Sequence, residues 1–194
     1  MLFLDRLKKI KKKEDTLTNK IEIRFASDSD LEALFEFITT HSFEPGYNNL
    51  PAHPVDKNHK FHKEDFINGK KKAYAKEPSE AGFGRTIIAL DGNKVVADLN
   101  LNLMHLNSAN HRVMLGMGML QPYRHQGIGS KMMTMAIEFC KSHQKKYIDL
   151  YVFDHNEPAK KLYEKFGFVK LMTVKEKFII DGFSVDDNLM VLKL

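Results

Sequence analysis

The feature of this sequence that most constrains its fold is a strand–turn–helix–strand unit over residues 112–153. The segment "HRVMLGMGML" predicts a strand, two glycines follow in "RHQGIGS", residues 128–142 carry an apolar helical stripe, and "KYIDLYVF" is a dense β-type run. Two strands joined through a helix in this way lie parallel, with a right-handed crossover. The chain is therefore expected to contain a parallel strand pair.

The other segments predict mostly antiparallel strands around this unit. Strands are expected in "IEIRFAS", in a hairpin of "RTIIAL" and "KVVADLNLNLM", and in a closing pair, "VKLMTVKEKFII" and "NLMVLKL". Helices are expected in "DSDLEALFEFITTHS", around "KEDFINGKKKAYAK" and in "EPAKKLYEKFG". The fold class is α/β (α+β), one domain with a mixed, mostly antiparallel sheet and flanking helices. Residues 43–82 are irregular, and a loop of this length in a compact domain is usually functional or mobile.

Composition excludes several classes of protein. The 194 residues, 43% of them hydrophobic, suit one globular domain. A single cysteine, Cys140, permits no disulfide within the chain, which favours a reducing, cytoplasmic compartment. No apolar run approaches the roughly 18 residues that a membrane span needs, so no integral membrane segment is expected.

The net charge of +5 is concentrated at the N-terminus. Residues 1–20 hold seven basic and three acidic residues, and residues 21–194 are nearly neutral. A nucleic-acid partner is therefore not expected. Residues 1–20 are interpreted as a basic N-terminal tail, either frayed in solvent or folded as a short helix on an anionic membrane or a partner.

Gly127 and Gly129 stand where a helix begins, although glycine costs a helix interior about 1 kcal/mol relative to alanine. A helix start presents unpaired N–H groups and positive potential to phosphate oxygens, and glycine permits close approach. The N–H groups of residues 125–130 could thus cradle a diphosphate, with Arg124 and Lys131 adding positive charge. The spacing matches neither a Walker loop nor a dinucleotide fingerprint, so an ordinary glycine-rich loop remains the alternative.

Two motifs in order, with a strand between them, strengthen the phosphate interpretation. "RHQGIGS" matches a (Q/R)xxGxG/A loop that holds the pyrophosphate of coenzyme A, and "NEPAKKLYEKFGF" matches an NxxAxxLYxKxGF segment. On these motifs the chain resembles the GNAT superfamily of acyl-CoA-dependent N-acyltransferases. The resemblance implies an N-acetyltransferase domain over residues 21–194, with acetyl-CoA as co-substrate and a central parallel strand pair that splays apart.

The implied site lies in the gap between the splayed strands. The pantetheine arm would pair with the backbone around Met117 and Met119, and the N–H of Met119 would bind the thioester oxygen as in an oxyanion hole. The sequence departs from the family at His125, where glycine is usual. The coenzyme-binding residues implied by the resemblance are Met117, Met119, Arg124, His125, Gln126, Gly127, Ile128, Gly129, Ser130, Asn156 and Tyr163.

Tyr163 and Met119 are the catalytic residues that the resemblance implies. Tyr163 would donate a hydrogen bond or proton to the departing thiolate, and the alternative is a tyrosine that only fills the core. Full proton donation is uphill, because a phenol titrates near about 10 and a thiol near about 8.5. Asn156 is expected either to bond to the pantetheine or to cap the following helix, and the two roles are compatible.

No general base is evident from the sequence. The strand "VMLGMGML" has no acidic residue, although several family members place a glutamate there. A water chain is one alternative, and the acidic candidates by composition are Glu36, Glu44, Asp98 and Asp149.

No metal site is predicted. His53, His59 and His62 lack a strong ligand spacing and have no supporting cysteine, so they are interpreted as part of a polar loop. Cys140 lies on the apolar stripe of its helix and is interpreted as a small buried hydrophobe.

Two functions of different class remain open. The first is an N-acetyltransferase in which a neutral primary amine attacks acetyl-CoA directly in a ternary complex. The second is a non-catalytic acyl-CoA-binding or sensor module. The acceptor is a small-molecule amine or a protein N-terminus, entering on the side of residues 36–50 and the last hairpin. A homodimer is possible, because chain pairing is common in the family.

The glycine turn yields a first prediction. Gly129→Val should abolish coenzyme A binding in a folded protein, because the β-branched side chain would stand where phosphate oxygens meet the backbone. Calorimetric titration with coenzyme A, alongside a melting curve, measures both effects. Undiminished affinity in the folded variant would contradict the role assigned to this turn.

Overall fold

The structure is a computed structural model that describes residues 21–194. The basic tail predicted for residues 1–20 lies outside the described residues. The described chain forms a seven-stranded mixed sheet in the order β1-β2-β3-β4-β5-β7-β6, in which only the β4–β5 pair is parallel. The predicted fold class is confirmed.

Each predicted strand and helix is present with bounds close to those expected, except that β7 begins at Phe183, well before the predicted strand "NLMVLKL". The strands are β1 (Ile21–Phe25), β2 (Gly84–Asp91), β3 (Lys94–Asn102), β4 (Arg112–Met119), β5 (Tyr147–Phe153), β6 (Val169–Ile180) and β7 (Phe183–Lys193). The helices are α2 (Leu31–His41), α3 (Lys63–Tyr74), α4 (Ile128–Ser142) and α5 (Glu157–Lys165). Within residues 21–194, none of the helices is long and apolar enough to cross a membrane.

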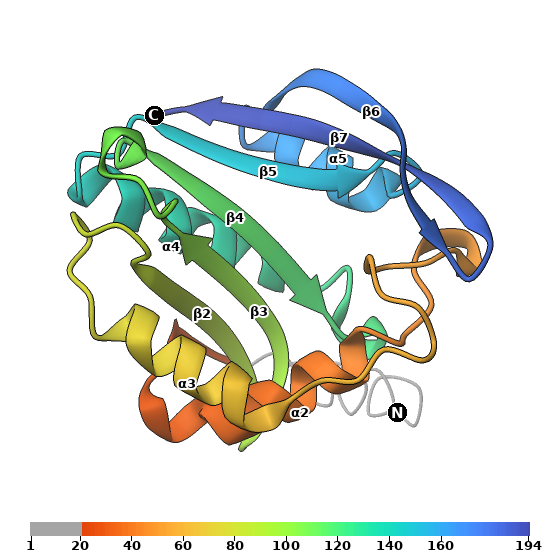
Figure 1. The fold of residues 1–194 in the computed structure, drawn as a ribbon, viewed down its shortest axis with the longest axis horizontal. Helices are drawn as coiled ribbons and strands as arrows, with labels where there is room; N and C mark the ends of the chain where they lie inside the picture. Colours follow the sequence, from red (N-terminus) through yellow and green to blue (C-terminus); the bar gives the residue numbers. More distant parts are fainter. Residues whose placement is uncertain (1–20) are drawn as a thin grey trace, which may run out of the picture.

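The sheet is covered on both faces. Figure 1 shows α2 and α3 in front of it and α4 and α5 behind it. The apolar stripes of the helices face the sheet, and Leu34 of α2 and Met132 and Met133 of α4 are fully buried. Cys140 lies on the same stripe of α4 and is also fully buried, as the sequence predicts. Burial raises the pKa of its thiol to about 12, so this cysteine is a packing residue.

In the closing hairpin the second strand, β7, lies next to β5, and the first strand, β6, lies outside it. β7 pairs antiparallel with β5 along the whole of β5, from Tyr147↔Lys193 to Phe153↔Asp187, and β6 forms the outer edge. The sequence predicts the hairpin but does not indicate which of its strands lies inside. The pairing brings the middle of β7 and the residues opposite it on β6 next to the end of β5.

The segment 43–62 lies across one end of the sheet. The amide of Gln121 donates to the carbonyl of Pro45 at 3.1 Å, and the ring of His155 lies 3.0 Å from the carbonyl of Pro51. The N–H of Lys57 donates to a carboxylate oxygen of Asp181 at 3.2 Å. These contacts connect the segment to the chain after β4, the chain after β5 and the β6–β7 turn, and Figure 1 shows it, in orange, beside that turn.

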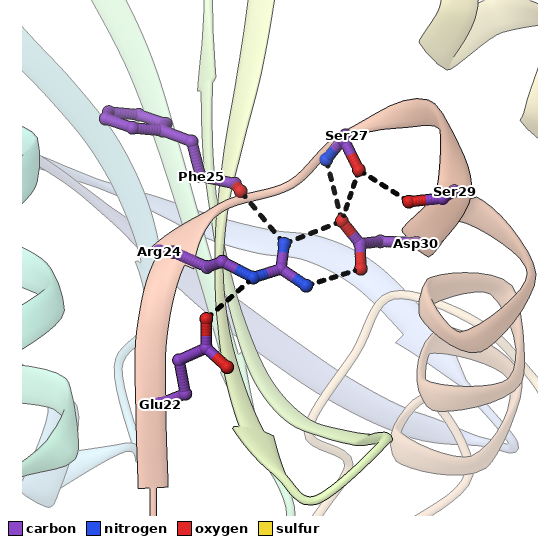
Figure 2. Close-up of polar contacts among 6 residues, drawn as sticks. All are labelled: Glu22, Arg24, Phe25, Ser27, Ser29 and Asp30. Atoms are coloured by element: carbon purple, nitrogen blue, oxygen red, sulfur yellow. Dashed lines mark hydrogen bonds and ion pairs between the residues drawn. The ribbon is translucent and has the colours of Figure 1, made fainter.

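A charged corner joins β1 to the start of α2 (Figure 2). Two guanidinium nitrogens of Arg24 donate to the two oxygens of Asp30 at 2.7 and 2.8 Å, and Asp30 also accepts from the N–H and hydroxyl of Ser27, both at 2.8 Å. The hydrogen bond from Arg24 holds the pKa of Asp30 well below its usual range. The corner therefore fixes the direction of α2, whose last residue is His41.

We expect Asp30→Ala to lower the free energy of unfolding by about 1–2 kcal/mol at pH 7, because it removes the capping box with Ser27 and a bidentate ion pair together. The pKa of Asp30 is lower in the folded state than in the unfolded chain. Its contribution is therefore present above pH about 4 and is lost as the pH falls below that value. Urea unfolding at pH 7 and pH 3 should show a difference between wild type and variant that shrinks at the lower pH.

Glu22→Ala is the matched control for this corner. Glu22 also bonds to Arg24, at 3.0 Å, but its side chain is 62% exposed. Exposed ion pairs contribute little, so the loss should stay below about 0.5 kcal/mol. Equal losses for both variants would show that the corner stabilises only through surface charge.

Candidate active site

The parallel strands β4 and β5 separate soon after they meet. They pair only from Arg112↔Tyr147 to Leu115↔Leu150. Beyond this, β4 continues to Met119 paired with β3 alone, and β5 continues to Phe153 paired with β7 alone. The splayed pair that the resemblance implies is therefore present, and Figure 1 shows β4 and β5 diverging in the middle of the sheet.

Two cavities of about 490 and 530 Å³ open at this gap. The first is lined by the glycine turn and by α5, and the second by β3, β5 and the β6–β7 hairpin. Both are lined by the end of β4, by His41, by His53 and by Tyr163. The gap thus has two compartments with a shared wall.

The glycine turn forms the first compartment much as the sequence predicts. Gly127 is the N-cap of α4 with φ +77°, a left-handed conformation that favours glycine. The first turn of α4 leaves N–H groups without helical partners, and Gly127, Ile128, Gly129 and Ser130 line the cavity. A Cβ on Gly129 would lie 3.3 Å from Leu162 on α5, so a larger side chain would occupy the space between α4 and α5.

His125 explains why this position of the family is usually glycine. It is exposed, lines the first cavity and has φ +62°. Residues other than glycine rarely adopt this left-handed conformation, although asparagine, aspartate and histidine do so more often than the rest. His125 therefore holds a backbone conformation that glycine would adopt without steric cost.

The positive charges at this compartment are only partly those predicted. Arg124 lines the cavity, and its Nε donates to the carbonyl of Met119 at 3.0 Å. Gln126 and Lys131 lie outside it, and the amide of Gln126 donates to the carbonyl of Pro122 at 2.8 Å. Two lysines of α5 line the cavity instead, Lys161 and Lys165.

Tyr163 lies at the shared wall of the two compartments. It is 6% exposed, and its ring packs on Phe168 with centroids 5.8 Å apart. Burial raises the pKa of its phenol to about 12, so the hydroxyl keeps its proton at neutral pH and acts as a hydrogen-bond donor. The ring is part of the core, as one interpretation of the sequence expects, and the residue also lines both cavities, where the expected role toward the thiolate stays a prediction.

Asn156 begins α5, and its side-chain oxygen accepts from the N–H of Ala159 at 3.3 Å. The predicted helix cap is therefore present. Asn156 also lines both cavities, and its amide N–H groups remain for a ligand.

Met119, the expected oxyanion donor, already has a partner. Its N–H donates to Nε2 of His41 at 3.0 Å, across 78 residues of sequence. His41 belongs to none of the motifs that predict site residues. One signal was available, because His41 continues the buried face of α2 that includes Leu34 and Phe37.

Of the four acidic candidates for a general base, only Asp98 lines either cavity. Burial raises its pKa to about 6, and it accepts from the amide of Asn100 at 2.6 Å. Asp149 is paired with Arg112, Glu44 bonds to the N–H of Gln121, and Glu36 is exposed.

The second compartment has an apolar side and a charged side. Phe37, Ile38 and Phe178 supply apolar surface. Lys177 supplies a cation, whose Nζ lies 2.8 Å from the carboxylate of Asp187 and 3.3 Å from the ring centroid of Tyr151. Asp187 is 2% exposed, and one of its oxygens has no hydrogen-bond partner. Within residues 21–194, no three His, Cys, Asp or Glu side chains gather as metal ligands would.

The comparisons agree with this architecture. The model of the acetyltransferase (GNAT) family matches residues 45–168, which is more than half of the chain. The chain belongs to this family of acetyltransferase enzymes, and the resemblance noted in the sequence is confirmed.

Individual relatives extend the match beyond those residues. L-amino acid N-acetyltransferase AaaT of Escherichia coli (strain K12) is 27% identical over 87% of this chain and 94% of its own length. A GNAT-family acetyltransferase from Streptococcus pneumoniae has a similar fold, with a TM-score of 0.77, 21% identity and coverage of 90% of this chain and 99% of that one. YncA, a putative acetyltransferase from Salmonella typhimurium solved with its cofactor acetyl-CoA, has a TM-score of 0.75, 13% identity and coverage of 90% and 94%.

Proposed function

We propose that this protein transfers the acetyl group of acetyl-CoA to the amino group of a small α-amino acid or a closely related amine. The observation that carries the proposal is the pair of compartments that share Tyr163 and the end of β4. Such a shared wall allows an acyl donor and an amine to meet without a covalent acyl-enzyme.

The first compartment fits coenzyme A. N–H groups at the start of α4, together with Arg124, Lys161 and Lys165, offer donors and positive charge for a diphosphate. The inner edge of β4 offers unpaired backbone for an extended pantetheine arm, as an added strand would use it. Acetyl-CoA, when bound, supplies a thioester carbonyl, and a relative of this fold was solved with it.

The chain's own residues have distinct roles in this proposal. Tyr163 donates a hydrogen bond to the sulfur as the carbon–sulfur bond breaks, which its raised pKa permits without ionisation. Met119 provides an N–H for the carbonyl oxygen. The walls formed by Phe37 and Ile38 exclude water from the acceptor side.

The acceptor class rests on Lys177 and on the name of the E. coli relative. Lys177 is 27% exposed and lines the second compartment, so its ammonium is placed to bind a carboxylate on the substrate. The apolar side of that compartment suits an uncharged substrate side chain. A protein N-terminus lacks the neighbouring carboxylate and would gain nothing from Lys177.

Tyr163→Phe should lower turnover by about 10²-fold or more while leaving acetyl-CoA affinity within about threefold, because only the donor to the leaving sulfur is lost. Tyr74→Phe is the matched control. The Tyr74 hydroxyl is buried without a partner and lines neither cavity, so turnover should not change. Wild-type turnover in the Tyr163 variant would exclude the proposed role.

Acetyl-CoA consumption over matched pairs of an L-amino acid and its decarboxylated amine tests the acceptor. Lys177→Gln keeps a donor for Asp187 but removes the charge, so KM should rise at least tenfold for amino acids and change little for the decarboxylated amines. Lys175→Gln is the control, because Lys175 pairs with Asp186 on the exposed side of β6. Binding of acetyl-CoA without turnover on any amine would instead support a non-catalytic acyl-CoA-binding module.

A further inference from the structure

The two histidines at the shared wall form a chain of hydrogen bonds that ends on β4. His41, the last residue of α2, is 6% exposed and stacks on Phe37 with ring centroids 5.2 Å apart. Its Nε2 accepts from the N–H of Met119 at 3.0 Å. Its Nδ1 lies 2.5 Å from Nε2 of His53, which belongs to the 43–62 segment.

These contacts determine where the ring protons are. A backbone N–H can only donate, so Nε2 of His41 must carry a lone pair. In a neutral imidazole the single proton is then on Nδ1, which donates it to Nε2 of His53. His41 is therefore held as the tautomer whose lone pair points toward the gap between β4 and β5.

The surroundings keep both rings uncharged at pH 7. Burial lowers the pKa of His41 to about 3, with a further contribution from His53 and Arg124, and it lowers the pKa of His53 to about 4. The charged side chains that line the two cavities around these rings are Asp98, Arg124, Lys161, Lys165, Lys177 and Asp187, and Tyr163 of α5 lines both cavities. Asp98 and His41 both lie next to Gly118 of β4. A Cβ added to this glycine would lie 2.9 Å from Oδ1 of Asp98 and 2.9 Å from Cε1 of His41.

We infer that His41 is the general base for the acceptor amine and that His53 is the positioning residue that fixes its tautomer. The inference rests on the proposed function and assigns a base that no acidic side chain on β4 supplies. In the free protein the lone pair on Nε2 of His41 accepts the hydrogen bond from the N–H of Met119. When the thioester oxygen takes that N–H, the lone pair is released beside the reacting carbon.

The proton balance of the transfer is simple. The amine nitrogen forms a bond to the carbonyl carbon, the carbon–sulfur bond breaks, and the thiolate departs with the electron pair. The N–H proton that the nitrogen loses goes to Nε2 of His41, and solvent removes it after the product leaves. A resting pKa near 3 keeps Nε2 unprotonated, and negative charge developing on the thioester oxygen raises that pKa as the proton arrives.

Asp98 is a poorer candidate, although it is close. It already accepts from Asn100, and the charge of Lys70 nearby favours its carboxylate. Lys70 in turn donates to Thr86 at 3.1 Å and to Asn100, so the carboxylate belongs to a buried network on β2 and β3. We assign Asp98 to holding that network.

The tautomer can be tested without measuring activity. In protein labelled with ¹⁵N-histidine, we expect His41 at pH 7 to show a protonated Nδ1 and an unprotonated Nε2. Adding acetyl-CoA without an acceptor amine should shift the Nε2 resonance of His41 and the amide resonance of Met119 together. The reason is that the thioester oxygen would replace Nε2 as the partner of the Met119 N–H. A proton on Nε2, or no change at either resonance on saturation, would overturn the inference.

Kinetics then test the base itself. His41→Gln keeps an acceptor for Met119 but removes the base, so kcat should fall by about 10²–10⁴-fold with acetyl-CoA affinity within about threefold. In His41→Ala, added imidazole should restore turnover, and the rescue by imidazoles of similar size should rise with their pKa. His59→Gln on the same segment is the control, because His59 is exposed, its ring packs on Phe61 and it lines neither cavity.

His53 is tested by a pair of variants. His53→Leu removes the acceptor for Nδ1 of His41 and should lower kcat by about tenfold or more with little change in KM. His53→Gln offers an oxygen in its place and should restore most of that loss. Equal losses in both variants would show that His53 only fills space.

The outcomes separate this inference from the proposed function. If wild type acetylates no amine, the proposed function fails whatever the histidines do. If wild type is active and His41→Gln keeps its turnover, or imidazole rescue is independent of pKa, the function stands and His41 is not the base.

Discussion

The early separation of β4 and β5 is the constraint on which the rest of this structure depends. Inside a sheet each strand normally forms hydrogen bonds with the N–H and C=O groups of its neighbours along its length. Between β4 and β5 only four residue pairs are in register. At Met119 side chains replace the missing strand, because His41 accepts from its N–H and Arg124 donates to its carbonyl. Protein groups thus hold a place in the sheet that a ligand can take by exchange of hydrogen bonds.

Elements far apart in the sequence meet around the gap. α2 is anchored at its start by the Arg24–Asp30 corner and brings His41 to the gap at its end. The 43–62 segment is bonded to the chain ends that follow β4 and β5, and it brings His53 to the same point. The β6–β7 hairpin adds the charged side of the second compartment.

Charged and uncharged side chains occupy different parts of the site. Cations face the glycine turn, where a diphosphate would lie, whereas the shared wall holds uncharged groups. Burial acts in opposite directions on the two kinds of side chain there, raising the pKa of Tyr163 and lowering that of His41. A neutral hydroxyl that donates and a neutral imidazole that accepts suit the proposed transfer from a thioester to an amine, and hydrogen bonds gain strength away from water.

The sequence by itself determined the parts of this protein that are encoded over a few consecutive residues. Hydrophobic periodicity and turn-forming residues predicted the βαβ unit, the hairpins, the glycine turn and the helix that carries Tyr163. Each of these depends on residues within a few positions of one another. The tertiary structure alone decided which hairpin strand lies beside β5, and it brought Lys177 to the second compartment. It also joined His41 to Met119 and to His53, contacts that follow from how α2 and the 43–62 segment pack on the sheet. No local pattern specifies such contacts, since their partners meet only when distant elements share one core.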